Sequence, residues 1–323
     1  MENFVLEIKE ISKSFGGKRA VNDVNFSVLR GEIVGFLGPN GAGKTTVMNV
    51  ITGLLSPDKG IVRLFGVDGG ASLSKNRNRI GYLQEKPRIY PDMSARDYLH
   101  LFARLYDVRN ANRRVIDVME RVGISFAADR MLGTFSRGMQ QRTCLARVMI
   151  HKPDFLILDE PTLGLDPVGV SDLREIFREM RHNGVTLMFS SHQLAEIERI
   201  CDSVIFMSSG KVVAQGRTAD LIPKADDSGV LTVELFEPIH LILPKIKAIP
   251  IIEHAVEIDN HRISVVLSAG SAHFERDRRA ELVRLLTGIG LTVLSVGTSS
   301  YTLEDVFLKL ISEGQRSITN KGR

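Results

Sequence analysis

The sequence predicts an α/β protein in which a layered α/β domain, residues 1–222, precedes a smaller α+β domain, residues 223–323. The chain has 323 residues, which at ~150 residues per domain suggests two domains. Up to about residue 220, short apolar runs alternate with segments of helical spacing, as in α/β layered architectures. The polar stretch "PKADDSG" at 223–229 then indicates a boundary.

The strands expected in the first domain are short and rich in β-branched or aromatic residues. Several are continuously apolar, which suits parallel strands buried on both faces. We place them at 32–38, 155–161, 185–192 and 203–210, and the opening "MENFVLEIKE" alternates like a further strand. Helical spacing is found between them at 44–53, 137–150 and 169–182.

The second domain contains a different order of elements. "VLTVELF", "IIEHAVEI" and "RISVVLS" are predicted strands, followed by a helix at about 275–287 and the strand "LTVLSV". The order β-α-β-β-α-β with a final helix fits a small ferredoxin-like sandwich. That final helix, "LEDVFLKLI", has one apolar face for docking, formed by Leu303, Val306, Phe307 and Leu310.

The composition is that of a soluble globular protein, with 43% hydrophobic and 25% charged residues. A net charge of +4 is too small to argue for nucleic-acid binding. There is no run of ~18 apolar residues, and the acidic opening segment is unlike a signal peptide. Cys144 and Cys201 lie far apart in apolar patterns, which indicates reduced core thiols in a cytosolic protein. Any membrane role would therefore come through a partner.

The segment "GPNGAGKTT" at 38–46 follows a predicted strand and opens a predicted helix, the context that the P-loop pattern requires. Its glycines allow successive backbone N–H groups to surround phosphate oxygens, assisted by the helix N-terminus. Lys44 can reach the β- and γ-phosphates, and the Thr45 hydroxyl is placed for Mg²⁺. The spacing G-x-x-G-x-G argues against a dinucleotide fold. The predicted site comprises Gly38, Pro39, Asn40, Gly41, Ala42, Gly43, Lys44, Thr45 and Thr46.

Two adjacent carboxylates in "FLILDEP" supply the other half of a phosphate site. Asp159 comes at the carboxyl end of an apolar strand, where it can hold Mg²⁺ through water. Glu160 follows it and is positioned to polarise an attacking water. Together with the P-loop, these residues predict a site that holds phosphates with Mg²⁺ and positions a water for attack.

The segment "FSRGMQQR" at 135–142 begins a predicted helix in an unusual way. Ser136 suits an N-cap, because its hydroxyl accepts a free N–H of the first turn. Gly138 is harder to explain, since glycine inside a helix costs ~0.8–1 kcal/mol relative to alanine. Nothing nearby in the sequence supplies a partner for a bare backbone there.

These motifs together resemble the nucleotide-binding subunits of ABC transporters. "FSRGMQQR" is similar to the family's signature motif, with Ser136 on its serine and Gly138 on its second glycine, whereas Arg137 and Met139 replace the usual glycine and glutamine. The resemblance implies a mixed sheet with helices plus a helical subdomain that carries the signature. It also implies that two copies pair head to tail, so that Ser136, Arg137, Gly138, Met139 and Gln140 of one copy meet the γ-phosphate on the other's P-loop.

Further positions follow from the resemblance. Asp166 in "PTLGLDP" would reach across the dimer, and His192 in "SSHQLAEIERICD" would contact the γ-phosphate. Phe15 corresponds to the aromatic residue that stacks on adenine. The Q-loop residue is Gln84 by residue type, or Glu85 when the segment is counted without gaps against related exporters. We favour Glu85, which would join Thr45 and Asp159 as a metal ligand.

The last predicted helix indicates which group of ABC ATPases the chain resembles. "SSYTLEDVFLKL" is similar to the C-terminal extension of drug, sodium and polysaccharide exporter ATPases. The resemblance implies an ATPase subunit that powers transport, in the direction of export, through separate membrane permease subunits. Its expected place is the cytoplasmic face of the membrane, as a peripheral homodimer without nucleic acid; the substrate would be selected by the permease.

Two other classes of protein stay open: a soluble ABC ATPase that acts on DNA or ribosomes, and a nucleotide sensor that does not hydrolyse. A soluble ABC ATPase acting on DNA is disfavoured because Gly38 and Ser136 are too close in sequence for a long coiled coil between them. One acting on ribosomes usually carries two cassettes per chain, whereas this chain has one. A non-hydrolysing nucleotide sensor is disfavoured by Glu160 and His192.

Overall fold

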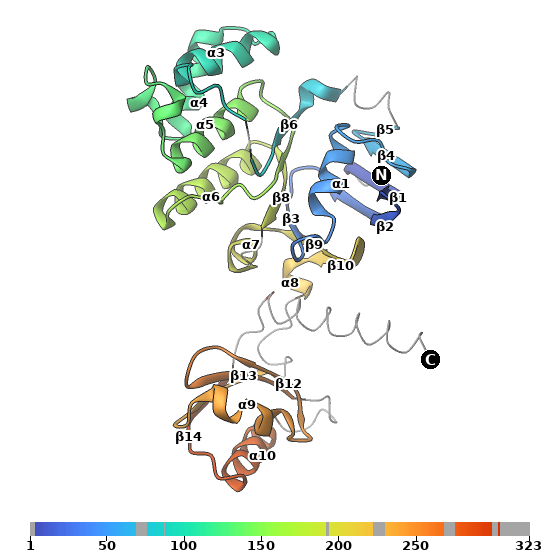
Figure 1. Cartoon of the computed structure of the whole chain (residues 1–323), viewed down its shortest axis with the longest axis vertical. Helices are drawn as coiled ribbons and strands as arrows, with labels where there is room; N and C mark the ends of the chain where they lie inside the picture. Colours follow the sequence, from blue (N-terminus) through green and yellow to red (C-terminus); the bar gives the residue numbers. More distant parts are fainter. Residues whose placement is uncertain are drawn as a thin grey trace. The chain divides into compact units, whose positions relative to one another are not determined.

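The computed structural model describes residues 4–68, 76–86, 88–191, 194–221, 230–267, 275–298 and 303. The chain divides into two compact units, the first running to Thr218 and the second beginning at Ala219 (Figure 1). Among the described residues, no helix has both the length and the apolar character needed to cross a membrane.

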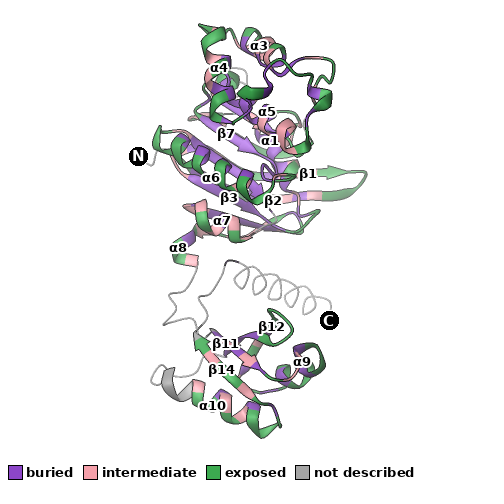
Figure 2. Ribbon diagram, turned by 90° about the vertical axis from the view of Figure 1, so that its left-hand side faces the viewer, coloured by how far each residue is buried: buried purple, intermediate pink, exposed green. Residues whose placement is uncertain are grey.

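A six-stranded sheet is the centre of the first unit. Its order is β10-β9-β3-β8-β7-β6, and all neighbours are parallel except the edge pair β10 and β9. Every residue of β3, β7 and β8 is buried, which explains the continuous apolar runs of β3 and β7 (Figure 2). β8 also buries the hydroxyl residues Thr186, Ser190 and Ser191. The strands are β3 (Ile33–Leu37), β6 (Ile80–Leu83), β7 (Phe155–Leu158), β8 (Thr186–Ser191), β9 (Ser203–Ser208) and β10 (Lys211–Arg217).

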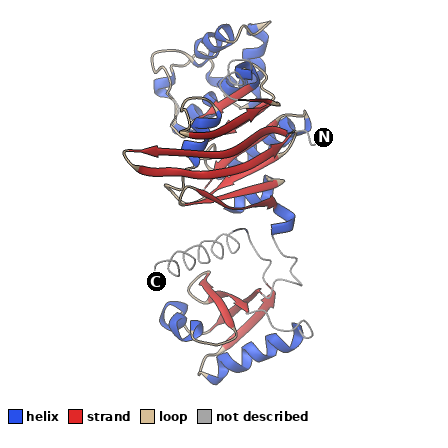
Figure 3. Cartoon of the chain, turned by 90° about the vertical axis from the view of Figure 1, so that its right-hand side faces the viewer, coloured by secondary structure: helices blue, strands red, loops and turns tan. Residues whose placement is uncertain are grey.

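A second, antiparallel sheet of order β2-β1-β4-β5 completes the core. Its strands are drawn in red in Figure 3. β2 alternates between buried and exposed residues over 24–29, which places one face of the strand inward. β1 buries Val5, Leu6, Ile8 and Ile11. One hydrophobic cluster joins residues of both sheets with the buried side of α1 (Lys44–Ile51). The strands are β1 (Phe4–Phe15), β2 (Lys18–Leu29), β4 (Lys59–Leu64) and β5 (Val67–Asp68).

Helices complete the first unit. The predicted helices at 44–53, 137–150 and 169–182 are confirmed as α1, α5 (Arg137–Met149) and α6 (Pro167–His182), with α7 (Leu194–Ile200) following. α8 (Thr218–Leu221) includes the boundary between the two units. A helical subdomain groups α3 (Ala95–Leu105) and α4 (Ala111–Arg121) with α5 (Figure 1). The mixed sheet and the helical subdomain expected from the resemblance are both present.

The second unit has its own core. Its elements are β11 (Val230–Leu235), α9 (Ile239–Lys247), β12 (Ile252–Glu257), β13 (Arg262–Leu267), α10 (Glu275–Gly288) and β14 (Val293–Thr298). The sheet is antiparallel with order β12-β13-β11-β14. Residues of α9 and α10 share one cluster with the inward residues of the strands, so both helices cover the same face. This is the predicted element order. Of the predicted closing helix, only Leu303 is described, and it is buried; Val306, Phe307 and Leu310 lie outside the described residues.

Candidate active site

The loop between β3 and α1 requires glycine at two positions. A Cβ on Gly38 would stand 2.3 Å from the carbonyl oxygen of Met207. Gly43 has φ +102°, and a Cβ there would stand 2.7 Å from the carbonyl oxygen of Ala20. No side chain caps the N-terminus of α1, which leaves its first N–H groups for a ligand. The loop therefore has the shape and polarity of a phosphate cradle.

Lys44 lies inside this loop. Its Nζ donates to the carbonyl oxygens of Gly38 at 2.7 Å and Pro39 at 3.3 Å, and the residue is 8% exposed. Burial lowers the pKa of Lys44, while the negative charges of Glu160, Asp159 and Glu85 act in the opposite direction. The ammonium is thus held on the concave side of the loop, where phosphate oxygens would come.

Asp159 meets the P-loop from the adjacent strand end. The Thr45 hydroxyl donates to Asp159 Oδ2 at 2.8 Å, and the Ser190 hydroxyl donates to Oδ1 at 2.6 Å. The carboxylate is almost fully buried, at 2% exposed, so these donors replace the water that it loses. Both oxygens of Asp159 are fixed in orientation.

Glu160 has an uncommon backbone for its residue type. Its φ of +51° lies in the left-handed region that few side chains other than asparagine and aspartate adopt. Its N–H donates to Ser190 Oγ at 2.9 Å. The residue lines the same cleft as Lys44 and Thr45.

A cleft of about 940 Å³ opens over these residues. Phe15, 51% exposed, lines it together with the cationic residues Lys18 and Arg19 from the start of β2. Aromatic surface beside positive charge and a phosphate cradle suits a nucleoside triphosphate. The predicted residues that line the cleft are Phe15, Asn40, Gly41, Ala42, Gly43, Lys44, Thr45, Thr46, Glu85, Asp159 and Glu160.

The start of α5 lies elsewhere in the unit. Ser136 is its N-cap and accepts from Met139 N at 3.3 Å. A Cβ on Gly138 would stand 3.5 Å from Gly164 O and from Leu165 Cδ2, which is ordinary contact. The fold of the chain itself therefore does not need a glycine at 138. Among the described residues, the segment 136–140 contributes nothing to the lining of the nucleotide cleft.

Comparison with known proteins agrees with this geometry. A family profile described as "ABC transporter" matches residues 21–163. The linearmycin resistance ATP-binding protein LnrL of Bacillus subtilis is 30% identical over 310 residues, which cover 95% of this chain and 98% of that protein. The bacitracin transport ATP-binding protein BcrA of Bacillus licheniformis is 31% identical over 314 residues, covering 96% and 98%. The chain belongs to the ABC transporter ATP-binding proteins.

A solved ATP-binding subunit of an ABC transporter has the same fold as this ABC ATPase. It superposes with a TM-score of 0.63 and 32% identity, covering 67% of this chain and 91% of that one. The function predicted from the sequence, an ATP-binding and ATP-hydrolysing subunit of an ABC transporter, is confirmed. Of the alternatives, the non-hydrolysing sensor is thereby excluded.

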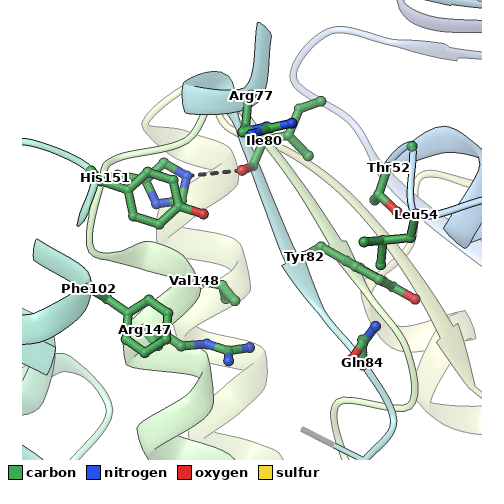
Figure 4. A pocket seen from close by; sticks show the side chains of 12 residues that line it. Thr52, Leu54, Arg77, Ile80, Tyr82, Gln84, Phe102, Arg147, Val148 and His151 are labelled. Carbon is green, nitrogen blue, oxygen red and sulfur yellow. Dashed lines mark hydrogen bonds between the residues drawn. The ribbon is translucent and has the colours of Figure 1, made fainter. Parts of the chain in front are cut away.

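The two Q-loop candidates of this ABC ATPase lie in different cavities. Glu85 lines the nucleotide cleft, whereas Gln84 lines a separate pocket of about 320 Å³. Figure 4 shows Gln84 below Tyr82 in that pocket, with Phe102 and Arg147 across from it.

The segment around Asp166 packs against the signature. Gly164 and Leu165 are the residues nearest to Gly138, while Asp166 is exposed and caps α6 by accepting from Gly169 N at 2.8 Å. Gln140 Nε2 donates to the carbonyl oxygens of Leu132 and Phe135, which closes the turn before α5. His192 lies outside the described residues.

Sequence reasoning missed Lys18, Arg19 and Ser190. The signal for the two cations was the sequence "FGGKR", since a tight turn after Phe15 returns the chain to the same cleft. The signal for Ser190 was a hydroxyl at the end of an otherwise apolar strand, "TLMFSS". Its partners depend on which strand lies next to it, and this order is set by the sheet.

Proposed function

We propose that two copies of this chain pair head to tail and hydrolyse ATP at two shared sites, driving export through separate permease subunits. Each site is formed by the P-loop of one copy and the signature helix of the other. Gly138 carries the proposal: it is a helical glycine that the chain's own fold does not need, next to the exposed Ser136. The nucleotide bound by a second copy would contact the helix backbone at Gly138, which no side chain covers.

The oxygen ligands present fit Mg²⁺. A hydroxyl and a carboxylate, of Thr45 and Asp159, already meet at 2.8 Å, and Glu85 lies in the same cleft. The described residues contain no group of three or more His, Cys, Asp or Glu able to hold a metal by themselves. Mg²⁺ keeps waters and takes substrate phosphates, so it does not need such a cage. When bound, it would neutralise charge on the β- and γ-phosphates.

Individual side chains of the chain have separate roles in ATP binding and hydrolysis. Lys44 exchanges its two loop carbonyls for phosphate oxygens, and Phe15 packs on the adenine. Glu160 orients the attacking water and accepts its proton, because its buried backbone aims the carboxylate into the cleft. By the family resemblance, His192 contacts the γ-phosphate and Asp166 reaches the second copy.

At the signature, the N-terminus of α5 supplies N–H donors and the positive end of a helix dipole to the γ-phosphate of the other copy. We assign residues 1–222 to this catalytic domain and residues 223–323 to an accessory domain that supports dimerisation or regulation. The relatives' names, linearmycin resistance and bacitracin transport, support export as the direction. The subunit would act at the cytoplasmic face of the membrane, without nucleic acid, and the permease selects the substrate.

Replacement of Glu160 tests the catalytic assignment. Glu160→Gln is expected to bind ATP as the natural chain does, because the P-loop is intact, while turnover falls about 10²- to 10⁴-fold. It should also accumulate as an ATP-bound dimer in sedimentation. Glu175→Gln, an exposed carboxylate on α6, is the matched control and should hydrolyse ATP normally. Near-normal ATPase activity of Glu160→Gln would overturn the assignment.

A further inference from the structure

We propose that Ser190 is a positioning residue for ATP hydrolysis, whose single hydroxyl fixes both the Asp159 carboxylate and the Glu160 backbone. The inference rests on the roles proposed above for those two residues. Ser190 is fully buried, at 0% exposed, and does not line the nucleotide cleft, so its effect on the reaction would pass through those two residues.

The sheet register brings Ser190 to this place. β8 lies between β3 and β7, and Leu158 at the end of β7 pairs with Phe189. Ser190, the next residue of β8, therefore lies beside Asp159, the first residue after β7. Parallel strands have their carboxyl ends at one edge of a sheet, so the hydroxyl comes directly beneath the phosphate site.

The hydroxyl uses both of its hydrogen-bonding capacities. It donates to Asp159 Oδ1 at 2.6 Å and accepts from Glu160 N at 2.9 Å. The three groups form one polarised chain from the Glu160 N–H through the hydroxyl to the carboxylate. A methyl group in its place would leave two buried polar atoms without these partners.

Each bond constrains one functional group. Thr45 holds Asp159 Oδ2 and Ser190 holds Oδ1, so the plane of the carboxylate cannot rotate. At Glu160, the bond to the backbone N–H maintains the left-handed turn, φ +51°, that directs the side chain into the cleft. Loss of the hydroxyl would therefore affect both the metal ligand and the water-orienting group.

The test compares two variants of Ser190 in the full-length chain. Ser190→Ala removes the hydroxyl and Ser190→Thr keeps it. Thr186→Val is the matched control, because it removes an equally buried hydroxyl at the other end of β8, where Thr186 Oγ1 accepts from Gly31 N at 2.9 Å. The readouts are kcat, KM for ATP, the Mg²⁺ concentration for half-maximal nucleotide binding, and the unfolding temperature without nucleotide.

We expect Ser190→Ala to lower kcat about 10- to 100-fold and to raise the Mg²⁺ requirement, with little change in nucleotide binding without Mg²⁺. Ser190→Thr and Thr186→Val should have a kcat and a Mg²⁺ requirement close to those of the natural chain. Activity of Ser190→Ala within about twofold of the natural chain, or equal losses in Ser190→Ala and Thr186→Val, would overturn the inference. Failure of the proposed function is recognised separately, because Glu160→Gln would then retain activity.

Discussion

Replacement of Gly138 by alanine separates a role in the chain's own fold from a role toward a second copy. A Cβ at 138 would meet its nearest atoms, Gly164 O and Leu165 Cδ2, at 3.5 Å, so no steric cost is expected. Alanine favours a helix over glycine by up to ~1 kcal/mol. Without nucleotide, Gly138→Ala should therefore unfold at the same temperature as the natural chain or up to about 4 °C higher.

Although the unfolding temperature of Gly138→Ala should stay the same or rise, its rate of ATP hydrolysis should fall. If the backbone at 138 faces the γ-phosphate on a second copy, the added methyl would displace that phosphate from its reactive position. A misplacement of ~1 Å can cost about 10²-fold in rate, so we expect a loss of at least about tenfold in kcat. Nucleotide affinity of the monomer should be unchanged, because the P-loop residues are untouched.

Gly38→Ala is the contrasting variant. Its Cβ would stand 2.3 Å from Met207 O, so this variant should lose stability and nucleotide binding together. Thermal unfolding without nucleotide and steady-state ATPase assays on both variants provide the comparison. A Gly138→Ala chain that is destabilised as strongly as Gly38→Ala, or that hydrolyses ATP at the natural rate, would refute the reasoning.

Two other perturbations test the shared site and the second domain. Ser136→Arg should weaken ATPase activity and ATP-driven dimerisation while monomer ATP affinity stays normal; a loss of affinity as large as that of Lys44→Ala would contradict the shared site. Truncation after Leu221 should leave a folded, ATP-binding core with altered basal ATPase activity or weaker self-association, measured by circular dichroism, ATPase assay and sedimentation. An insoluble truncated chain would show that residues 222–323 are structural, and unchanged kinetics and association would contradict a regulatory or dimer-supporting role.

The parts of the fold that sequence predicts best are those with strong local patterns. β3 and β7 are buried along their whole length and have continuous apolar sequences. No predicted helix covers α4, although Val115, Val118 and Met119 form a clear apolar face along it. Its N-cap residue, Asn110, makes no side-chain cap bond, so the usual signal for a helix start is weak there.

The residues of the candidate active site also differ in how well the sequence predicts them. The P-loop and the pair Asp159 and Glu160 are contiguous in sequence, so their chemistry could be predicted from spacing alone. The bonds of Ser190 cross from β8 to the end of β7, and they depend on strand order, which no local pattern encodes. The choice between Gln84 and Glu85 depends on which cavity each faces, a difference of one residue at the end of β6.

The most direct test of the shared site is a cross-link between two differently substituted chains. Asn40→Cys places a thiol on the P-loop and Ser136→Cys places one at the signature, each in a Glu160→Gln background that retains ATP. The natural cysteines, Cys144 and Cys201, are buried and their pKa values are raised by that burial, so they should stay unreactive.

After mixing and addition of a mild thiol oxidant, which accepts the two electrons, we predict a disulfide-linked dimer that joins the Asn40→Cys chain to the Ser136→Cys chain and forms only with ATP. Either variant alone should give no such product. A cross-link that is independent of ATP, or the absence of any cross-link while both chains bind ATP, would contradict the head-to-tail arrangement.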